Sequence, residues 1–363
     1  MEIVQNPSRG KLFFAHHFTF KREWLFVLLI FLFMRAVLAA VPLVTLWQTG
    51  PVVPPWMNPS RIGYQGMVET LSIANPVLKL FVSSWYRWDT GWFIQIAESG
   101  YSAANGTMSF MPLYPLLILG VHALLGGNAL VSALLVSNIF CAVALILFYE
   151  AARLELGADR LARQSLLYLV TFPSAFFLFA GYSESLFLTC VLAAWLLARR
   201  GDWHWAALSS ALAVLTRLQG LALVVPLGWQ LLASRAAGGS ENPLEEFRSV
   251  FAFIFRERGW LQLLRDWKRP AWIGALFPLI ALALYSAGTT IVGLNSVLSG
   301  YASRDSSLAY PWQGLVEFFS RIFSQQFQYA DAIDLAVFIL FFGALIYGIR
   351  KLRPALTLFS AAL

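Results

Sequence analysis

Apolar runs of about twenty residues recur along this chain of 363 residues, and short polar segments separate them. The first run extends from Trp24 to Trp47. A helix of about this length can cross the roughly 30 Å hydrocarbon core of a bilayer. Segments that alternate polar and apolar residues, as the strands of a membrane barrel do, are absent from the sequence. The pattern predicts an all-α polytopic membrane protein.

The basic residues divide the sequence into two kinds of segment. Five segments hold 19 of the 26 lysines and arginines, namely 9–22, 153–163, 199–200, 235–269 and 350–353. Because basic residues favour the cytoplasmic side, we place these segments in the cytoplasm. This predicts a cytoplasmic loop at about 235–270 and outer loops at about 48–128 and 294–332.

Connecting these assignments predicts one transmembrane domain over residues 1–363. Its expected parts are single spans at 24–47, about 129–149, 271–293 and 333–349, and hairpins over 165–198 and 205–234. The segment "MPLYPLLILGVHALLG" is also apolar, but a crossing there would put the basic segment 153–163 outside. We therefore expect this segment to form an interfacial helix on the outer surface.

The two hairpins are too short to cross the membrane fully. Their legs of about 17 and 15 residues correspond to roughly 23 to 26 Å of helix, which is less than the hydrocarbon core. Their tips are "GYSES" at 181–185 and "TRLQG" at 216–220, both rich in polar groups. We expect these tips to lie below the outer surface and to line a wet cavity that opens sideways to lipid.

The composition agrees with a membrane protein and leaves few other classes of protein open. Hydrophobic residues make up 59% and charged residues 12%, whereas soluble domains carry about 25% charged residues. The net charge of +7 is explained by the cytoplasmic bias of basic residues, so no nucleic-acid partner is expected. Cys141 and Cys190 lie in apolar helices, and the four histidines lack ligand spacing. We predict neither a metal site nor a cofactor.

Two arginines lie in segments predicted to be inside the membrane. Arg35 is near the middle of the first span, and Arg217 lies at a hairpin tip. A charge at mid-bilayer costs about 2.5 to 3.5 kcal/mol. Each arginine either has a structural partner, for which Glu184 is a candidate, or holds a phosphate group with its guanidinium fork.

The stretch "RWDTGWFIQIAESGY" places Asp89 among tryptophans that include Trp88 and Trp92. Tryptophans are typical anchors at the membrane interface, and they also stack on sugars. Asp89 is either an ordinary solvated carboxylate or a base that accepts a proton from an alcohol. Arg87 is a candidate orienter or auxiliary phosphate ligand, and Glu98 and Glu184 are the next candidate bases.

Four stretches in order resemble the PIG-V family, the GPI mannosyltransferase II proteins and their prokaryotic relatives. They are "RWDTGWFIQIAESGY", "FMPLYPLLI", "FPSAFFLFAGYSESLFL" and "LTRLQGLALVVPL", between residues 87 and 227. The resemblance implies a GT-C-like helical bundle with interfacial helices in a large first outer loop. It also implies that this loop carries the catalytic acidic residue. The donor it implies is a polyprenyl-phosphate sugar, in this family mannose.

The family's motif positions fall on particular residues of this sequence. Asp89 matches the acid of "RWD", Glu184 the glutamate of "YSES" and Arg217 the arginine of "TR..G". No second acid adjoins Asp89 as in the DxD or DE motifs of other GT-C branches, so a metal is not expected. The chain ends inside an apolar run where relatives would continue, which suggests a shortened sequence or a short homologue.

We therefore predict a membrane glycosyltransferase that moves mannose from a polyprenyl-phosphate donor to a hydroxyl of a lipid or glycan acceptor. The transfer inverts the anomeric centre, with Asp89 as base, at the non-cytoplasmic face of a prokaryotic cell membrane, or of the endoplasmic reticulum in a eukaryote. The predicted donor-site residues are Arg35, Arg87, Trp88, Trp92, Tyr182, Glu184 and Arg217. The alternative is a lipid or sugar transporter, or flippase, without covalent chemistry, although no motif occurs twice.

Overall fold

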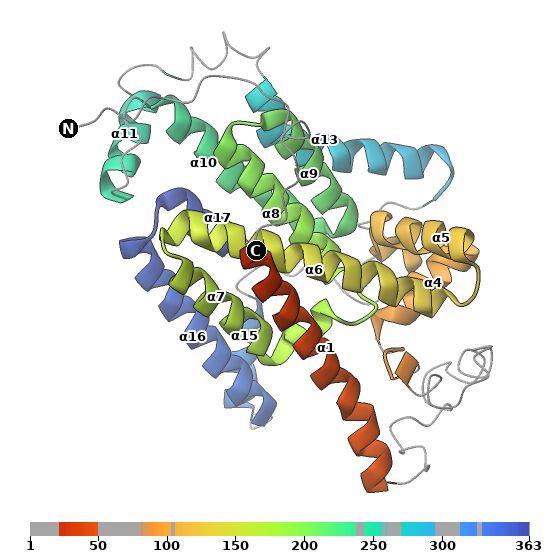
Figure 1. Cartoon of the computed structure of the whole chain (residues 1–363). Helices are drawn as coiled ribbons and strands as arrows, with labels where there is room; N and C mark the ends of the chain where they lie inside the picture. The colour runs from red at the N-terminus through yellow and green to blue at the C-terminus, as the bar shows by residue number, and fades with distance from the viewer. Residues whose placement is uncertain are drawn as a thin grey trace.

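A computed structural model describes residues 22–49, 81–82, 84–86, 88–102, 106–236, 243–255, 259, 270–294, 313–324 and 329–362. Every regular element in these ranges is helical, which confirms the predicted all-α class (Figure 1). The α-helices are α1 (Arg22–Thr49), α4 (Asp89–Ser99), α5 (Leu113–Leu125), α6 (Ala129–Leu156), α7 (Asp159–Thr171), α8 (Glu184–Arg200), α9 (Trp203–Thr216), α10 (Val224–Arg235), α11 (Pro243–Phe255), α13 (Pro270–Ile291), α15 (Gln313–Phe323), α16 (Tyr329–Lys351) and α17 (Pro354–Ala362). Three 3-10 helices are η3 (Thr107–Ser109), η4 (Pro173–Leu178) and η5 (Leu218–Leu223).

Four of the described helices are long and apolar enough to cross a membrane: α1, α6, α13 and α16. They coincide with the four predicted single spans. The helix α6 continues beyond the predicted end at Tyr149, and it stops where Gly157 adopts a left-handed conformation with φ of 66°. Glycine reaches this conformation without the steric cost that other residues carry, which is why α6 ends there.

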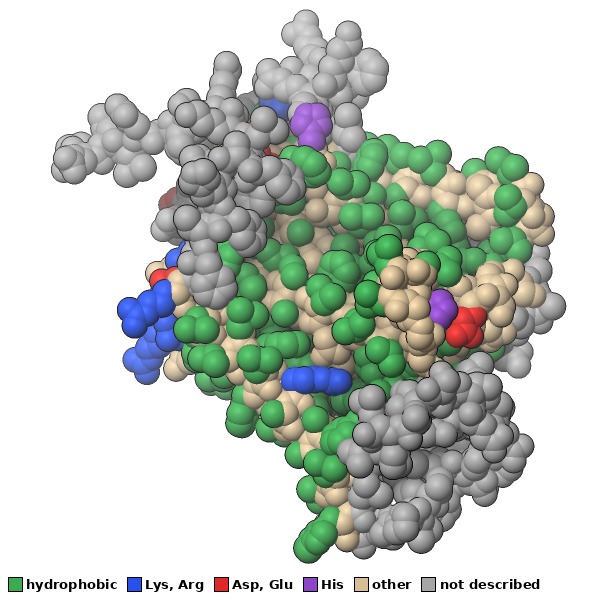
Figure 2. Space-filling model, turned by 45° about the vertical axis from the view of Figure 1, so that its right-hand side comes forward, with side chains coloured by type: hydrophobic (Ala, Val, Ile, Leu, Met, Phe, Trp, Pro, Cys, Tyr) green, Lys and Arg blue, Asp and Glu red, His purple; other side chains and the backbone are tan. Residues whose placement is uncertain are grey.

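The outermost helices expose apolar side chains. On α1, Leu29, Leu32 and Phe33 are exposed, and on α16 the exposed side chains include Ile339 and Leu340. The visible face of the molecule is accordingly dominated by hydrophobic side chains, with few charges among them (Figure 2). In water such a surface would be unfavourable, whereas in a bilayer it contacts lipid tails.

Short helices form the two predicted hairpins. The helices α7, α8, α9 and α10 have 13, 17, 14 and 12 residues. At 1.5 Å per residue these lengths correspond to about 18 to 26 Å, so the prediction of short legs is confirmed. The first hairpin starts at Asp159 rather than at 165, because α7 begins directly after the turn at Gly157.

The tip of the first hairpin packs against α6 well inside its N-terminal end. The Ser137 hydroxyl of α6 donates to the Tyr182 carbonyl at 2.8 Å, and the Ser185 hydroxyl donates to the Ser137 carbonyl at 2.9 Å. Ser137 comes two helical turns after Ala129, the first residue of α6, which is about 12 Å along the helix axis. These bonds fix the polar tip at that depth relative to α6.

The helices α4 and α5 lie together at the N-terminal end of α6, on the right of Figure 1. Their contact is aromatic, because the ring of Phe93 packs edge-on against Phe110 and Tyr114 at 5.1 and 4.8 Å. The apolar segment predicted to be interfacial forms α5, which has only 13 residues and is too short to span. The helix is confirmed, and its position at the membrane interface stays a prediction.

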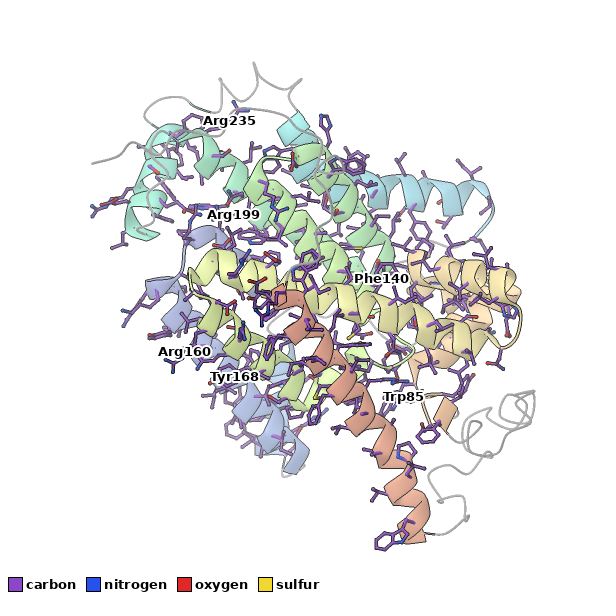
Figure 3. The ribbon with its side chains drawn as sticks, viewed as in Figure 1. Trp85, Phe140, Arg160, Tyr168, Arg199 and Arg235 are labelled. Carbon is purple, nitrogen blue, oxygen red and sulfur yellow. The ribbon has the colours of Figure 1, made fainter. Side chains whose placement is uncertain are left out.

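Basic residues gather at the opposite end of the bundle. Arg160, Arg199 and Arg235 lie toward the left of Figure 3, and Trp85 lies toward the right. Three buried glutamates join helices at this end, each accepting from an arginine and a tryptophan indole N–H. The groups are Trp24–Glu150–Arg153, Trp195–Glu155–Arg199 and Trp229–Glu246–Arg353, with donor–acceptor distances of 2.8 to 3.1 Å.

Candidate active site

Asp89 is the first residue of α4, and its side chain is exposed. The chain enters this helix through Trp88, whose φ of 40° is the only positive value at a non-glycine residue in the described ranges. Such a conformation costs on the order of 1–3 kcal/mol, and strained residues of this kind cluster at functional sites. Thr90 is fully buried and donates its hydroxyl to the Trp85 carbonyl at 3.3 Å, which closes the turn.

Two glycines allow close packing around the start of α4. A Cβ atom on Gly91 would lie 2.7 Å from the Tyr86 hydroxyl, so Tyr86 covers the helix at that point. A Cβ atom on Gly181 would lie 3.2 Å from the Thr90 methyl group. The "DTG" and "GYSES" motifs, about ninety residues apart in the sequence, are therefore in direct contact.

Tyr182 connects the two motifs chemically. Its side chain is only 4% exposed, and its hydroxyl lies within hydrogen-bonding reach of the Thr90 hydroxyl and the Asp89 backbone. A tyrosine hydroxyl keeps its proton at neutral pH, because its ordinary pKa is about 10. This hydroxyl is therefore protonated and can act as a hydrogen-bond donor beside Asp89.

Glu184 and Arg217 form an ion pair between the two hairpin tips. Arg217 Nη1 donates to Glu184 Oε1 at 2.5 Å and to the Ser183 hydroxyl at 3.3 Å. The pair agrees with the interpretation of Glu184 as a counter-ion of Arg217, and the depth of Arg217 in the membrane stays a prediction. Both contacts leave from Nη1, and no bond from Nε or Nη2 occurs within the described chain, so part of the guanidinium fork can bind another anion. Glu184 Oε2 is buried without a partner among those same residues.

The second tip depends on a tight turn at Gly220. Arg217 follows the last residue of α9, and the Gly220 N–H donates to the Arg217 carbonyl at 2.9 Å. A Cβ atom on Gly220 would lie 2.5 Å from the Val214 backbone nitrogen, closer than real Cβ contacts. Only glycine lets η5 fold back this closely onto α9, and that fold-back holds Arg217 toward Glu184.

The structure separates the two tryptophans that flank Asp89. The Trp88 side chain is 72% exposed, and its ring lies 6.1 Å from that of Phe177. Phe177 in turn contacts Tyr182, with ring centroids 5.3 Å apart. Trp92 is half-buried and stacks on Phe110 at 6.1 Å within the fold. Trp88 is therefore the exposed aromatic surface next to Asp89.

The remaining predicted site residues lie elsewhere or outside the described ranges. Arg35 Nη1 donates to the Phe179 carbonyl at 3.4 Å, and its guanidinium lies over the Trp85 ring, 4.8 Å from the centroid. Arg35 thus joins α1 to the segments that precede Asp89 and the first hairpin tip. Arg87 falls outside the described residues. Glu98 lies near the other end of α4, about 14 Å along the helix from Asp89.

The arrangement has counterparts among known proteins. A family model described as mannosyltransferase (PIG-V) matches residues 27–235 of this chain. The chain belongs to the PIG-V mannosyltransferase family. The matched region contains the whole cluster of Asp89, Tyr182, Glu184 and Arg217, and the family resemblance inferred from the motifs is confirmed.

Curated PIG-V relatives are found in mammals. GPI alpha-1,6-mannosyltransferase 2 of Rattus norvegicus is 31% identical over 176 residues, which cover 46% of this chain and 34% of the relative. The protein of the same name from Mus musculus is 34% identical over 161 residues, which cover 42% of this chain and 32% of the relative. This chain therefore matches about a third of the length of these relatives. No solved structure matches it.

The cluster gathers four kinds of functional group within the region matched to PIG-V. It holds an exposed carboxylate, a protonated phenol, an arginine with free donors and an exposed indole. No group of three or more His, Cys, Asp or Glu side chains that could hold a metal occurs in the described part of the chain. The sequence did not reveal Ser137 and Phe177, although a serine inside an apolar span was a signal that could have indicated the first.

Proposed function

We propose that this chain transfers mannose from a polyprenyl-phosphate donor to a hydroxyl of a lipid or glycan acceptor at the non-cytoplasmic face of its membrane. The observation that carries the proposal is the convergence of Asp89, Tyr182 and the Glu184–Arg217 pair within the region matched to PIG-V. The name of the relatives, GPI alpha-1,6-mannosyltransferase 2, specifies an α-1,6 linkage and GPI. We extend to this chain only the transfer of mannose.

The proposed reaction is a direct displacement that inverts the anomeric carbon. The acceptor oxygen attacks that carbon while the bond to the phosphate oxygen breaks and its electron pair leaves with the lipid phosphate. The hydroxyl proton moves to the Asp89 carboxylate, which later releases it to water. The departing phosphate is already a stable anion, so it needs charge stabilisation rather than a proton.

Each part of the cluster has a proposed role in this displacement. The free donors of Arg217 bind the phosphate, and Glu184 holds the guanidinium in place through Nη1. The Tyr182 hydroxyl acts as a hydrogen-bond donor beside Asp89 and orients the Asp89 carboxylate. The exposed ring of Trp88 stacks on the sugar, Trp92 anchors α4, and Arg35 positions both neighbouring segments. Arg87 is proposed as an auxiliary phosphate ligand.

The test is a transfer assay with the purified chain. Polyprenyl phosphate that carries radiolabelled mannose is incubated with the protein and extracted membrane lipids. The labelled products are then separated and identified. We expect mannose bonded covalently to an acceptor, with the opposite anomeric configuration. If labelled donor crosses liposome membranes intact and no mannosylated product forms, the chain is a flippase and the proposal is wrong.

A further inference from the structure

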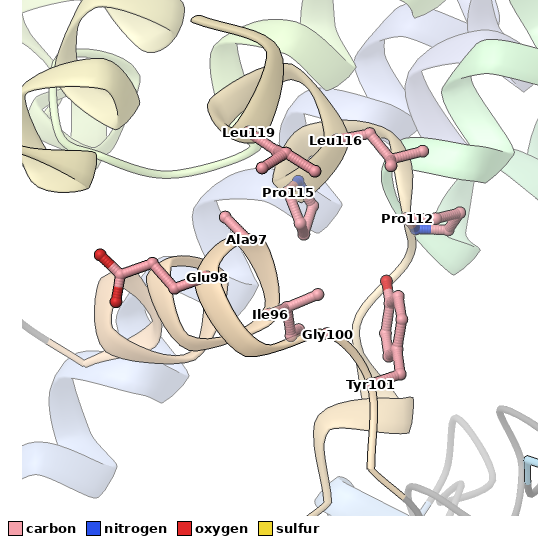
Figure 4. A pocket seen from close by; sticks show the side chains of 9 residues that line it. All are labelled: Ile96, Ala97, Glu98, Gly100, Tyr101, Pro112, Pro115, Leu116 and Leu119. Atoms are coloured by element: carbon pink, nitrogen blue, oxygen red, sulfur yellow. The ribbon is translucent and has the colours of Figure 1, made fainter. Parts of the chain in front are cut away.

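A pocket of about 340 Å³ lies between the C-terminal part of α4 and the first turns of α5 (Figure 4). It is at the end of α4 opposite to Asp89. Most of its lining is apolar: Ile96, Ala97, Pro112, Pro115, Leu116 and Leu119. The Tyr101 hydroxyl is already occupied, because it donates to the Phe110 carbonyl at 3.1 Å. In Figure 4 the Glu98 carboxylate points away from the apolar side chains, at the edge of the pocket.

The pocket opens beside an exposed apolar face of α5. Leu116 and Leu119, which line it, are 58% and 44% exposed, and Leu124 farther along the same helix is 85% exposed. In the predicted interfacial position of α5, this face lies against the boundary between headgroups and acyl chains. The pocket is therefore continuous with an exposed apolar surface, and its volume is within the usual range of ligand sites.

We propose that this pocket binds one acyl chain of a membrane glycerolipid whose headgroup carries a primary ammonium group. The apolar lining accepts the chain, and the Glu98 carboxylate at the edge attracts the ammonium group. Among the described residues that line the pocket there is no lysine or arginine, so these residues offer no counter-charge to an anionic lipid such as a polyprenyl phosphate. This lipid site is separate from the proposed transfer site and does not depend on mannosyl transfer.

The site can be tested by photolabelling the intact protein in lipid nanodiscs. Phosphatidylethanolamine with a photoactivatable acyl chain should label peptides of α4 and α5. Leu116→Trp fills the pocket and should remove most of that label. Leu124→Trp changes the same exposed face without touching the lining, so its labelling should match the wild type. Glu98→Gln should keep the label but lose a preference of about two- to fivefold over phosphatidylglycerol, the size expected for an exposed ion pair.

Three results would overturn the proposal. Equal labelling of the two tryptophan variants would mean that the chain lies on the helix surface and not in the pocket. A preference for phosphatidylglycerol, or for a photoactivatable polyprenyl phosphate, would contradict the assigned headgroup. A preference that persists in Glu98→Gln would remove Glu98 from the site. If Leu116→Trp does not insert, the wild type is labelled in the presence of excess unlabelled competitor lipid. Phosphatidylethanolamine should then reduce the label on α4 and α5 more than polyprenyl phosphate does, and an equal or smaller reduction would contradict the proposal.

Discussion

At the residue scale, the candidate site contains two carboxylates in different circumstances. Asp89 is exposed at the start of a helix, whereas Glu184 holds Arg217 at 2.5 Å and has its second oxygen buried. A base must be free to receive a proton. An ion-paired carboxylate accepts a proton less readily, because the partner cation occupies its oxygen and stabilises its charge. This difference favours Asp89 as the base and Glu184 as the residue that positions Arg217.

The role of Asp89 is tested by Asp89→Asn. The amide keeps the shape of the side chain but cannot take up a proton, so the rate of transfer should fall by roughly 10² or more. Folding and donor binding should remain. The measurement is the turnover of radiolabelled donor, with Glu317→Gln as the control, because Glu317 is an exposed carboxylate on α15. A well-folded Asp89→Asn protein with wild-type turnover would show that another residue is the base.

The role of Arg217 is tested by Arg217→Lys. Lysine keeps the charge and can still pair with Glu184, but it loses the second arm of the guanidinium fork. The free energy of donor binding should weaken by about 1 to 3 kcal/mol. The protein is titrated with a non-transferable analogue of the polyprenyl-phosphate donor, and the change in tryptophan fluorescence gives the affinity. Arg321→Lys is the control, since Arg321 forms a comparable pair with Asp331 at 2.9 Å. Unchanged affinity in Arg217→Lys would contradict a phosphate-binding role.

The charged and aromatic residues that carry the family motifs could be singled out from the sequence, but Ser137 and Phe177 could not. Arg217 and Glu184 stand out because a charge in an apolar hairpin needs a reason. Ser137 and Phe177 are ordinary residues of membrane helices, and their role depends on which helix faces them. Trp88 and Trp92 have the spacing of one helical face, but the positive φ of Trp88 takes it out of the register of α4.

At the element scale, hydrophobic length predicted the long helices well and the short ones incompletely. The spans α1, α6, α13 and α16 were found because about twenty apolar residues have few other uses. The helices α11 and α15 were missed inside predicted loops, because both are short and mix charged with apolar residues. Charge alone defined those loops, and it does not report on helix formation.

The turn between α9 and η5 gives a prediction with a matched control. In Gly220→Ala the new methyl group would meet the Val214 backbone at 2.5 Å, so the chain must shift. The protein should lose about 1 to 3 kcal/mol of stability, as overpacked sites do, and part of its donor affinity. Gly228→Ala lies in α10 with nothing within 4 Å and should gain about 0.5 to 1 kcal/mol. The measurement is the midpoint of thermal unfolding in detergent, compared between the two variants. Equal midpoints would contradict the close approach.

At the scale of the whole molecule, helix pairing lay beyond the sequence. The helices α9 and α13 approach closely because Gly274 has no side chain, and a Cβ atom there would lie 2.9 Å from the Trp203 ring. Such contacts depend on shape at a few positions, and composition does not reveal them. The separation of a basic end from the end with α4 and α5 was predicted from the distribution of arginine and lysine alone.

The orientation of the two ends can be measured directly. Ser99→Cys, at the exposed end of α4, should react with an impermeant thiol reagent applied from outside. Arg160→Cys, exposed near the start of α7, should react only after permeabilisation. The native Cys141 and Cys190 are buried and should give little background. Labelling of both positions from the same side would contradict the predicted topology.

The sunken tip makes the proposed enzyme sensitive to the thickness of its bilayer. The distance from Tyr182 to the N-terminal end of α6, which is predicted to face outward, is fixed by the bonds through Ser137. A lipid phosphate resides at the headgroup plane, and that plane moves outward as acyl chains lengthen. In phosphatidylcholine with longer chains the donor phosphate must descend farther to reach Arg217, so transfer in reconstituted vesicles should slow as the chains lengthen. A rate independent of chain length would mean that the donor reaches the tip by another route.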